Sequence, residues 1–495
     1  MSMTKDQPPG GAPAGSGSPS EIHLKSNVLT LFDSTAVAVA SVAPAYSIAS
    51  TIGLVVAAVG FTSPAVILVS FVPVLAIAFA YYYMNKQDPN CGASYSWVSR
   101  TVSPYLGWVN GWVQVCASVI FCTSASILIG QNTLSFLNTL GVVSSATAGS
   151  IYWTALVASL WFILITWICL VGIRATANFQ WVLVAIEYVA VIIFSVLAVI
   201  KVLGSHPKGS TGFHIAWLNP FALHGVSGLA SGAVLGVFFF WGWDTSANLN
   251  EESQEASENP GLAGINSMFL LLIVFLINNI AMQMLVPSSV IQKQGGNALY
   301  YFAQQVLPAP WNYIMLLAIL TSTIATTQTT LLPASRITLA MARDKVFPKV
   351  FASINKNWLT PAYGTIILAA LAFVGIWLTT FSSSVNNVFG NLISQIGILV
   401  AFYYGVTGIA SAWAYRKVLT QKVSLLIFAG ILPFLGGVFL LWIGYQVVVQ
   451  AGFSASLPVL ISIGLGIPLV IIARFTSKGE YFKQKAVAYD MSLFE

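Results

Sequence analysis

Residues 33–58 have the sequence DSTAVAVASVAPAYSIASTIGLVVAA, a run of apolar and small residues with a proline in its middle. The run is long enough to cross about 30 Å of hydrocarbon as one helix. Pro44, however, has no amide hydrogen, and its ring collides with the preceding helical turn. We therefore predict a membrane-spanning helix that is interrupted between Ser41 and Ser47.

Similar apolar runs recur along the whole chain of 495 residues, of which 57% are hydrophobic and 7% charged. Soluble proteins carry about 25% charged residues, and a soluble core has no room for so many long apolar helices. Because a bilayer offers no water to backbone groups, each run must be a helix. The composition predicts an all-α polytopic membrane protein with about twelve transmembrane helices. The predicted spans are 33–58, 63–84, 105–130, 151–172, 177–202, 226–250, 262–286, 312–340, 362–381, 387–414, 424–448 and 455–474.

Lysine and arginine residues predict the orientation, because they concentrate on the cytoplasmic side of membrane proteins. With the N-terminus inside, the cytoplasmic segments hold 17 of the 20 basic residues, and only Lys201, Lys208 and Lys293 lie outside. We predict a multi-pass protein of the cell membrane with both termini in the cytoplasm. Residues 1–27 are rich in Gly, Pro and Ser, so they are predicted to be a disordered tail, without the apolar region of a cleaved signal peptide.

Several other functional classes find no support in the sequence. The net charge of +6 follows from topology, and no basic patch with interleaved aromatics predicts a nucleic-acid partner. The four cysteines lack metal-binding spacing, so no metal and no cofactor are predicted. No HExxH, GxSxG or P-loop motif indicates an enzyme.

A second interruption is predicted in the sixth span, where Gly242 and Asp244 lie within the otherwise apolar stretch 238–245. A single kinked helix is common in membranes. Spans one and six, however, are the leading helices of two possible five-helix halves. Irregular helices at matching positions of two halves indicate the central site of a secondary transporter.

Three stretches resemble the amino acid–polyamine–organocation (APC) superfamily, in particular its bacterial amino acid permeases. They are DPNCGASYSW at 88–97, followed by the Gly-Trp pairs 107–108 and 111–112; FFFWGWD at 238–244, followed by NLNEE at 248–252 and Asn-Pro at 259–260; and RITLAMARDKVFP at 336–348, followed by Thr-Pro at 360–361. The resemblance covers nearly the whole chain.

The resemblance implies the fold of the sodium-coupled leucine transporter, with two inverted five-helix repeats and two peripheral helices. It predicts a first repeat at 28–205, a second repeat at 222–415, the peripheral helices at 423–475 and a cytoplasmic C-terminal tail at 476–495. It also implies alternating access around helices one and six.

Unwound helices free backbone amides for anionic groups and carbonyls for cations. In the resembled family the first break has the sequence Gly-Ser-Gly-Ile and holds a substrate carboxylate. Here Pro44 and Tyr46 replace glycines, so a carboxylate ligand is less assured. From this break we predict substrate contacts by Ser41, Ala43, Ala45 and Tyr46.

The second break contributes the predicted substrate contacts Phe240, Trp241, Gly242, Trp243 and Asp244. Aromatic rings there can hold an ammonium group through cation–π attraction. A carboxylate at membrane depth needs a partner or a hydrated cavity. Asp244 is predicted either to contact a substrate amine or to cap the second half-helix, and capping is favoured.

Two further features concern the coupling ion. Glu187 lies in the middle of the fifth span, and an intramembrane acid is a functional-site hypothesis by default. In some proton-coupled members of the family a lysine occupies this level in place of sodium, so Glu187 is predicted to carry a proton. Helix eight is rich in hydroxyl groups, and Thr326 and Thr327 keep sodium coupling open, although such threonines also serve in helix packing.

The remaining charges are predicted to be structural. The acidic segment that contains Glu251, Glu252, Glu255 and Glu258 is expected to be solvated, and Arg336, Arg343 and Asp344 are expected to form a cytoplasmic network that holds the inner gate.

The predicted function is secondary active transport of amino acids or related amines, such as polyamines, γ-aminobutyrate or ethanolamine. A proton-coupled carrier is favoured, and an exchanger or a sodium symporter stays open. A channel is disfavoured because no filter sequence is present. A nutrient-sensing receptor is disfavoured because neither tail is long.

Overall fold

The computed structural model describes residues 23–223, 225–381, 385–477 and 479–490. Residues 1–22 of the predicted N-terminal tail and residues 491–495 lie outside the described residues. Within these ranges the chain forms helices, and the single β-type feature is an isolated parallel bridge between Leu29 and Ser253. The main helices are α1 (Leu31–Val42), α2 (Pro44–Val59), α3 (Ser63–Gln87), α4 (Ser94–Thr101), α5 (Pro104–Thr139), α6 (Ser145–Ala148), α7 (Ile151–Val171), α8 (Ile173–Ser205), α9 (Gly225–Phe239), α10 (Thr245–Asn248), α11 (Asn259–Leu285), α12 (Ser288–Gln294), α13 (Ala298–Val306), α14 (Tyr313–Arg343), α15 (Ala362–Leu378), α16 (Val385–Ala414), α17 (Val423–Leu425), α18 (Leu432–Gly464) and α19 (Gly466–Thr476).

The helices confirm an all-α polytopic membrane protein. Ten helical segments of the described chain are long and apolar enough to cross a bilayer. One of them, Leu31–Gln87, covers the first two predicted spans, and the sixth predicted span contains only a shorter apolar helix, Gly228–Phe239. The number twelve, and the division into two five-helix repeats and two peripheral helices, therefore stay predictions.

The predicted interruption of the first span is present. Helix α1 ends at Val42, and α2 begins at Pro44, which occupies its first turn, where a missing amide costs nothing. Between them Ala43 has a φ of 51°, in the left-handed region. The residue before a proline avoids the α-helical conformation, so the helix changes direction at this one residue.

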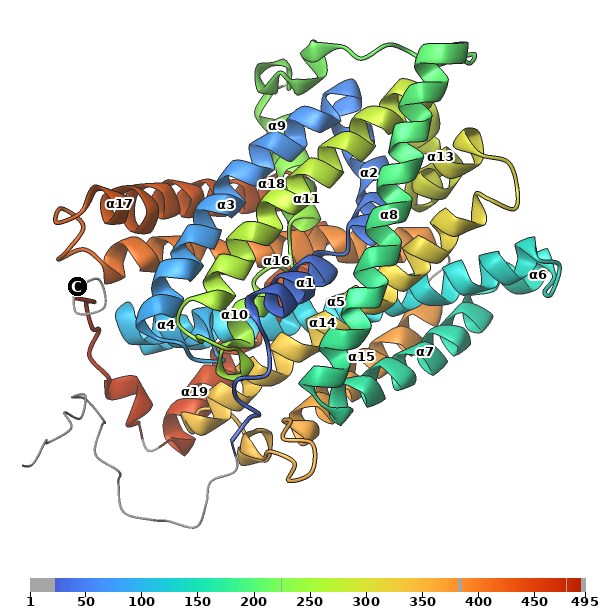
Figure 1. The fold of residues 1–495 in the computed structure, drawn as a ribbon. Helices are drawn as coiled ribbons and strands as arrows, with labels where there is room; N and C mark the ends of the chain where they lie inside the picture. The colour runs from blue at the N-terminus through green and yellow to red at the C-terminus, as the bar shows by residue number, and fades with distance from the viewer. Residues whose placement is uncertain (1–22, 224, 382–384, 478, 491–495) are drawn as a thin grey trace, which may run out of the picture.

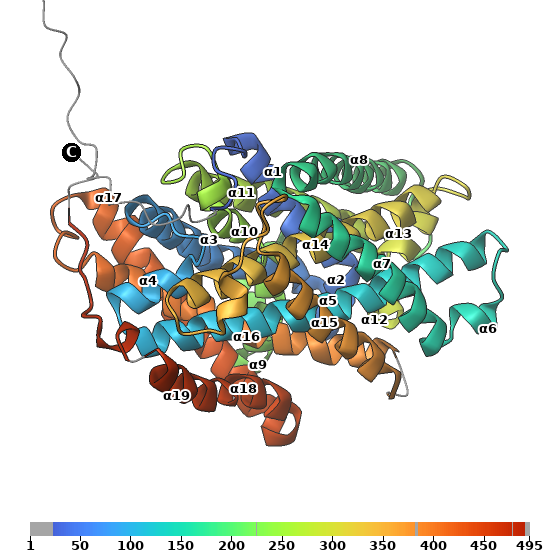
Figure 2. The same cartoon turned by 90° about the horizontal axis from the view of Figure 1, so that it is seen from below.

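Helix α1 lies next to α10 (Figure 1), on the side of the molecule that also carries α8 and α11 (Figure 2). It packs against α8, α11 and α14. Helix α16 packs against α5 on one side and α18 on the other. Seen from below, α18 and α19 lie on the opposite side of the molecule from α1, α8 and α11 (Figure 2). Helix α9 of the sixth span packs against α2, α3, α16 and α18.

Both described chain ends pack against one end of the helical bundle. The amides of Val28 and Leu29 donate to the carbonyl of Glu252 at 2.8 and 3.1 Å. Near the other end, the amide of Val487 donates to the Arg100 carbonyl in the last turn of α4, and the amide of Tyr489 donates to the Ala414 carbonyl at the end of α16, each at 2.9 Å. The segment 479–490 therefore joins α4 to α16.

Candidate functional site

The two helix interruptions touch each other. Gly242 has a φ of 119°, which L side chains rarely adopt, and a Cβ atom there would lie 2.8 Å from the carbonyl carbon of Ser41. Only a glycine allows the two backbones to approach so closely. The hydroxyl groups of Ser41 and Thr245 lie 2.8 Å apart, within hydrogen-bond distance. The unwound parts of the first and sixth spans therefore meet at Ser41 and Gly242.

A small cavity lies where the two interruptions meet. Its volume is about 20 Å³, room for about one water molecule, so in this conformation it is too small for a larger solute. The lining consists of Ser41, Gln114, Ser118, Trp241, Gly242, Asp244, Thr245, Asn248, Thr330, Pro333, Ile337 and Tyr403. Four of the nine predicted substrate contacts belong to this lining, namely Ser41, Trp241, Gly242 and Asp244.

Asp244 is the charged residue of this lining, and two tyrosines of α16 hold it. The hydroxyl of Tyr404 donates to Oδ1 at 2.9 Å, and that of Tyr403 donates to Oδ2 at 3.0 Å. The Trp241 indole in turn donates to the Tyr403 oxygen at 2.6 Å. Asp244 precedes α10, but its side chain makes no capping hydrogen bond. The side-chain hydrogen bond expected of a cap on the half-helix is therefore absent in this conformation, and the carboxylate accepts from the two tyrosines instead.

The other predicted aromatic contacts lie behind the lining. The Tyr46 ring packs edge-on against Phe121 at 5.5 Å, and Phe121 packs against Trp241 at 5.1 Å. Phe240 faces rings of α3 and α11, and Trp243 faces tyrosines of α3 and α16. Tyr46, Phe121 and Trp241 thus form an aromatic cover on the α2 side of the cavity.

The first interruption offers few amides to an anionic group. Pro44 has none, and the amide of Ala43 donates to the Val39 carbonyl at 2.9 Å. The amide of Tyr46 donates to the Ser322 hydroxyl of α14 at 3.0 Å. The amides of Ala43 and Tyr46 are therefore already bonded. In addition, Ala43, Ala45 and Tyr46 do not belong to the cavity lining in this conformation.

Glu187 lies on α8 and is fully buried. The Ser322 hydroxyl and the Ala45 amide are its polar neighbours. Neither of its carboxylate oxygens meets hydrogen-bond geometry with any group in the described part of the chain. An unsatisfied buried carboxylate is costly, and this one lies beside the first interruption.

The two predicted threonines of α14 differ in their contacts. The Thr326 hydroxyl donates to the carbonyl of Ser41, which the helix interruption leaves free. The Thr327 hydroxyl donates to the Thr323 carbonyl one turn earlier, at 2.7 Å. Thr326 and Ser322 thus face the first interruption, whereas Thr327 makes an ordinary intrahelical bond.

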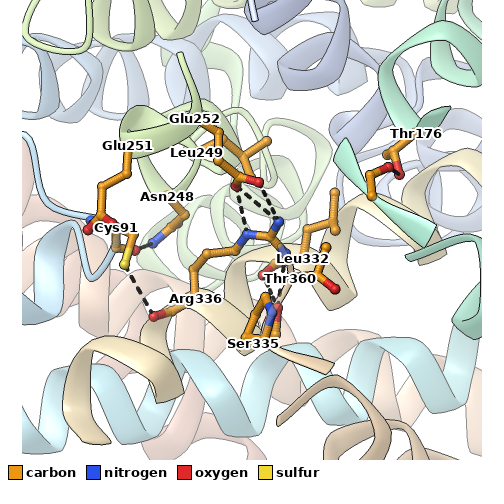
Figure 3. Close-up of polar contacts among 12 residues, drawn as sticks. Cys91, Thr176, Asn248, Leu249, Glu251, Glu252, Leu332, Ser335, Arg336 and Thr360 are labelled. Atoms are coloured by element: carbon orange, nitrogen blue, oxygen red, sulfur yellow. Dashed lines mark hydrogen bonds and ion pairs between the residues drawn. The ribbon is translucent and has the colours of Figure 1, made fainter. Parts of the chain in front are cut away.

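A buried ion pair joins Arg336 to Glu252, at the end of the site that the predicted topology assigns to the cytoplasm (Figure 3). The guanidinium of Arg336 donates twice to the Glu252 carboxylate, at 3.0 Å each, and both side chains are 1% exposed. The prediction that this acidic segment is solvated is wrong for Glu252. Arg336, 84 positions later in the chain, folds against it. Burial raises the pKa of Glu252 above its ordinary value, against the opposing effect of Arg336.

A second ion pair lies next to the first. Arg343 contacts the Glu251 carboxylate at 2.9 Å, and the Cys91 amide donates to the same carboxylate at 3.0 Å. Burial alone would raise the pKa of Glu251, but Arg343 and the Cys91 amide outweigh it and lower that pKa. Asn248, which lines the cavity, donates to the Cys91 carbonyl at 3.0 Å (Figure 3). This bond links the cavity to the charged network beneath it.

Several lining residues escape prediction from the sequence. Gln114 and Ser118 are polar residues of the largely apolar α5, Thr330 is one of many hydroxyl residues of α14, and Tyr403 lies in α16. Such residues usually serve in helix packing. The one available signal was the Tyr403–Tyr404 pair, since two neighbouring hydroxyl donors in an apolar span need buried acceptors.

Comparison with known proteins places the chain in a family. A profile of the amino acid permease family matches residues 29–470. The chain is 22% identical over 365 residues to the low-affinity putrescine importer PlaP of Escherichia coli (strain K12), which covers 70% of this chain and 73% of that protein. It is 24% identical over 333 residues to cationic amino acid transporter 3, mitochondrial, of Arabidopsis thaliana, covering 66% of this chain and 52% of that protein. It is 23% identical over 386 residues to the methylthioribose transporter of Bacillus subtilis (strain 168), covering 74% of this chain and 77% of that protein. The family match spans most of the chain, and with the helical fold it shows that the protein belongs to the amino acid permease family.

Proposed function

We propose that this protein is a secondary active transporter that carries small amines and amino acids across the plasma membrane by alternating access. Its substrate site is the cavity between the two helix interruptions. The observation that carries the proposal is the contact between these interruptions at Ser41 and Gly242, beside the carboxylate of Asp244. The 17-to-3 distribution of basic residues supports a cytoplasmic location for both termini.

The lining of the cavity favours a positively charged substrate group. Asp244 supplies a negative charge, and the Trp241 indole and the Tyr403 ring stand beside it. A carboxylate together with aromatic rings is the combination that binds an ammonium group, through an ion pair and through cation–π attraction. We therefore assign Asp244 to the amine of the substrate.

A substrate carboxylate finds less support. At the first interruption Pro44 has no amide, and the amide of Tyr46 is already bonded to Ser322. One of the similar proteins is named as an importer of putrescine. Putrescine is a diamine and has no carboxylate. We propose that simple amines are better substrates than α-amino acids.

A flux assay tests this assignment. The purified protein is placed in liposomes and offered labelled monoamines, diamines, cationic amino acids and neutral amino acids. We expect saturable uptake and counterflow exchange, with kcat/KM highest for an amine that lacks a carboxylate. No saturable flux of any of these solutes would overturn the transporter proposal, and a preference for neutral amino acids would overturn the amine assignment.

We further propose that Glu187 carries the coupled proton. The Glu187→Gln variant, which cannot titrate, is expected to lose accumulation driven by an imposed pH gradient. It should retain counterflow exchange of labelled substrate at equal pH, because exchange requires no net proton movement. The measurement is uptake into liposomes with proton and sodium gradients imposed separately.

The control is Glu187→Asp, which keeps a titratable carboxyl group at the same place and is expected to keep part of the pH-driven uptake. Undiminished pH-driven accumulation by Glu187→Gln would refute the role of Glu187. Accumulation that follows only the sodium gradient would instead point to the pair of hydroxyl groups, Ser322 and Thr326, that face the first interruption.

A further inference from the structure

A large cavity, separate from the proposed substrate cavity, lies at the end of the bundle that carries the charged network. Its volume is about 1520 Å³. Its walls come from α5, from α19 and from the segment 342–356 that follows α14. This cavity shares Glu251 and Arg343 with the charged network but shares no lining residue with the substrate cavity.

One rim of the cavity is basic. Lys345, Lys349 and Lys356 line it and are exposed. None of the three forms an ion pair with another group in the described ranges. Glu251, the acid in the lining, is already paired with Arg343. The three lysines therefore present uncompensated positive charge to any occupant.

Another part of the lining is apolar and aromatic. Trp112 of α5 lines it, with its indole donating to the Ser462 carbonyl of α18 at 2.8 Å. Trp108 lines it one turn earlier and donates to the Val346 carbonyl at 3.1 Å. Ile472 of α19 adds an aliphatic surface that is 56% exposed. Because α19 belongs to a segment that is long and apolar enough to span a bilayer, its exposed side chains, such as Ile472, are suited to contact with lipid.

A smaller hollow of about 300 Å³ has the same chemistry and also borders α19. Arg474 and Lys483 supply its charge, and Tyr105, Phe475 and Phe482 supply its aromatic lining. The end of α19 is therefore flanked by two hollows that combine basic side chains with aromatic rings.

We propose that the larger cavity binds the headgroup of an anionic phospholipid from the cytoplasmic leaflet, with the acyl chains along α19. Basic pockets at the cytoplasmic ends of membrane helices suit anionic headgroups, and indole rings suit the boundary between headgroup and hydrocarbon. A free phosphate compound would leave the exposed apolar wall uncovered, whereas a lipid satisfies both walls at once.

The test compares lipid binding to the purified full-length protein by native mass spectrometry, using phosphatidylglycerol and phosphatidylcholine with identical acyl chains. The wild type is expected to bind phosphatidylglycerol more tightly. The triple variant Lys345→Gln, Lys349→Gln, Lys356→Gln is expected to lose this preference. The ratio of the affinity for phosphatidylglycerol to that for phosphatidylcholine should fall about fivefold for each charge removed. Because the three lysines are exposed, the melting temperature without added lipid should not change.

A matched triple variant, Lys208→Gln, Lys417→Gln, Lys485→Gln, removes the same charge from exposed positions elsewhere. It is expected to retain the preference, and an equal loss in both triple variants would overturn the proposal. Equal affinity of the wild type for the two lipids would also overturn it. A third arm adds inorganic phosphate alone, and displacement of phosphatidylglycerol by phosphate would identify a soluble ligand and exclude the lipid.

Discussion

Replacement of Asp244 by asparagine is expected to reduce the kcat/KM for a cationic amine on the order of a hundredfold or more. The reason is that the carboxylate is the one charged group of the cavity lining in the described chain. Loss of one partner of a buried charge pair costs about 2–5 kcal/mol. The measurement is initial uptake into proteoliposomes over a range of amine concentrations. A wild-type rate in the Asp244→Asn variant would exclude this carboxylate from amine recognition.

The control for this prediction keeps the carboxylate and removes one of its donors. Tyr404→Phe deletes the hydroxyl that donates to Oδ1 at 2.9 Å, and Tyr404 does not line the cavity. Loss of one hydrogen bond to a charged group is worth about 1.5–3 kcal/mol at most, so a smaller loss is expected than for Asp244→Asn. The ratio between the two variants separates amine recognition from general disturbance of the site.

The second large effect is faster chemical labelling of Cys91, which we expect when the buried ion pair between Arg336 and Glu252 is broken. The Glu252→Gln variant leaves the guanidinium of Arg336 buried without its counter-charge, which costs about 3–5 kcal/mol. We expect the network to open locally and to expose Cys91, which is fully buried and whose thiol lies 3.7 Å from the Arg336 carbonyl. The measurement is the rate of Cys91 labelling by a maleimide, in a background where Cys116, Cys122 and Cys169 are replaced by alanine. An increase on the order of a hundredfold is expected.

Two variants control this experiment. Glu258→Gln breaks an ion pair with Lys86 that is 21–33% exposed, and such pairs contribute about 0–1 kcal/mol, so labelling should change little. The double variant Arg336→Met, Glu252→Leu removes both buried charges and should restore protection, because neither charge is then left unpaired. Equal labelling of the wild type and of Glu252→Gln would show that the pair does not hold the cytoplasmic side closed.

The fold was predictable where a single residue determines the local backbone conformation. Pro44 cannot continue a helix, so the end of α1 is visible in the sequence. Gly242 marks the second interruption, since its φ of 119° is a conformation that glycine adopts readily. The count of spanning helices was less accessible, because an interrupted span leaves a segment as short as Gly228–Phe239.

The site was predictable only in part, because its decisive contacts join residues that are far apart in the chain. The tyrosines that hold Asp244 lie 159 and 160 positions from it. Neighbours in sequence are also poor guides to a common lining. Phe240, Trp241 and Trp243 are almost consecutive, yet only Trp241 faces the cavity, because each residue of a turning backbone points in a different direction.

The segment 479–490 has a practical consequence for any work with this protein. Its backbone donates hydrogen bonds to the last turn of α4 through Val487 and to the end of α16 through Tyr489. The Tyr481 hydroxyl lies 2.7 Å from that of Ser99, also in α4. A fluorescent fusion or affinity tag should therefore start after Tyr489. A shortened chain that ends before Tyr481 would lose the hydrogen bonds that connect this segment to both α4 and α16. A loss of activity in such a chain would say nothing about solute recognition.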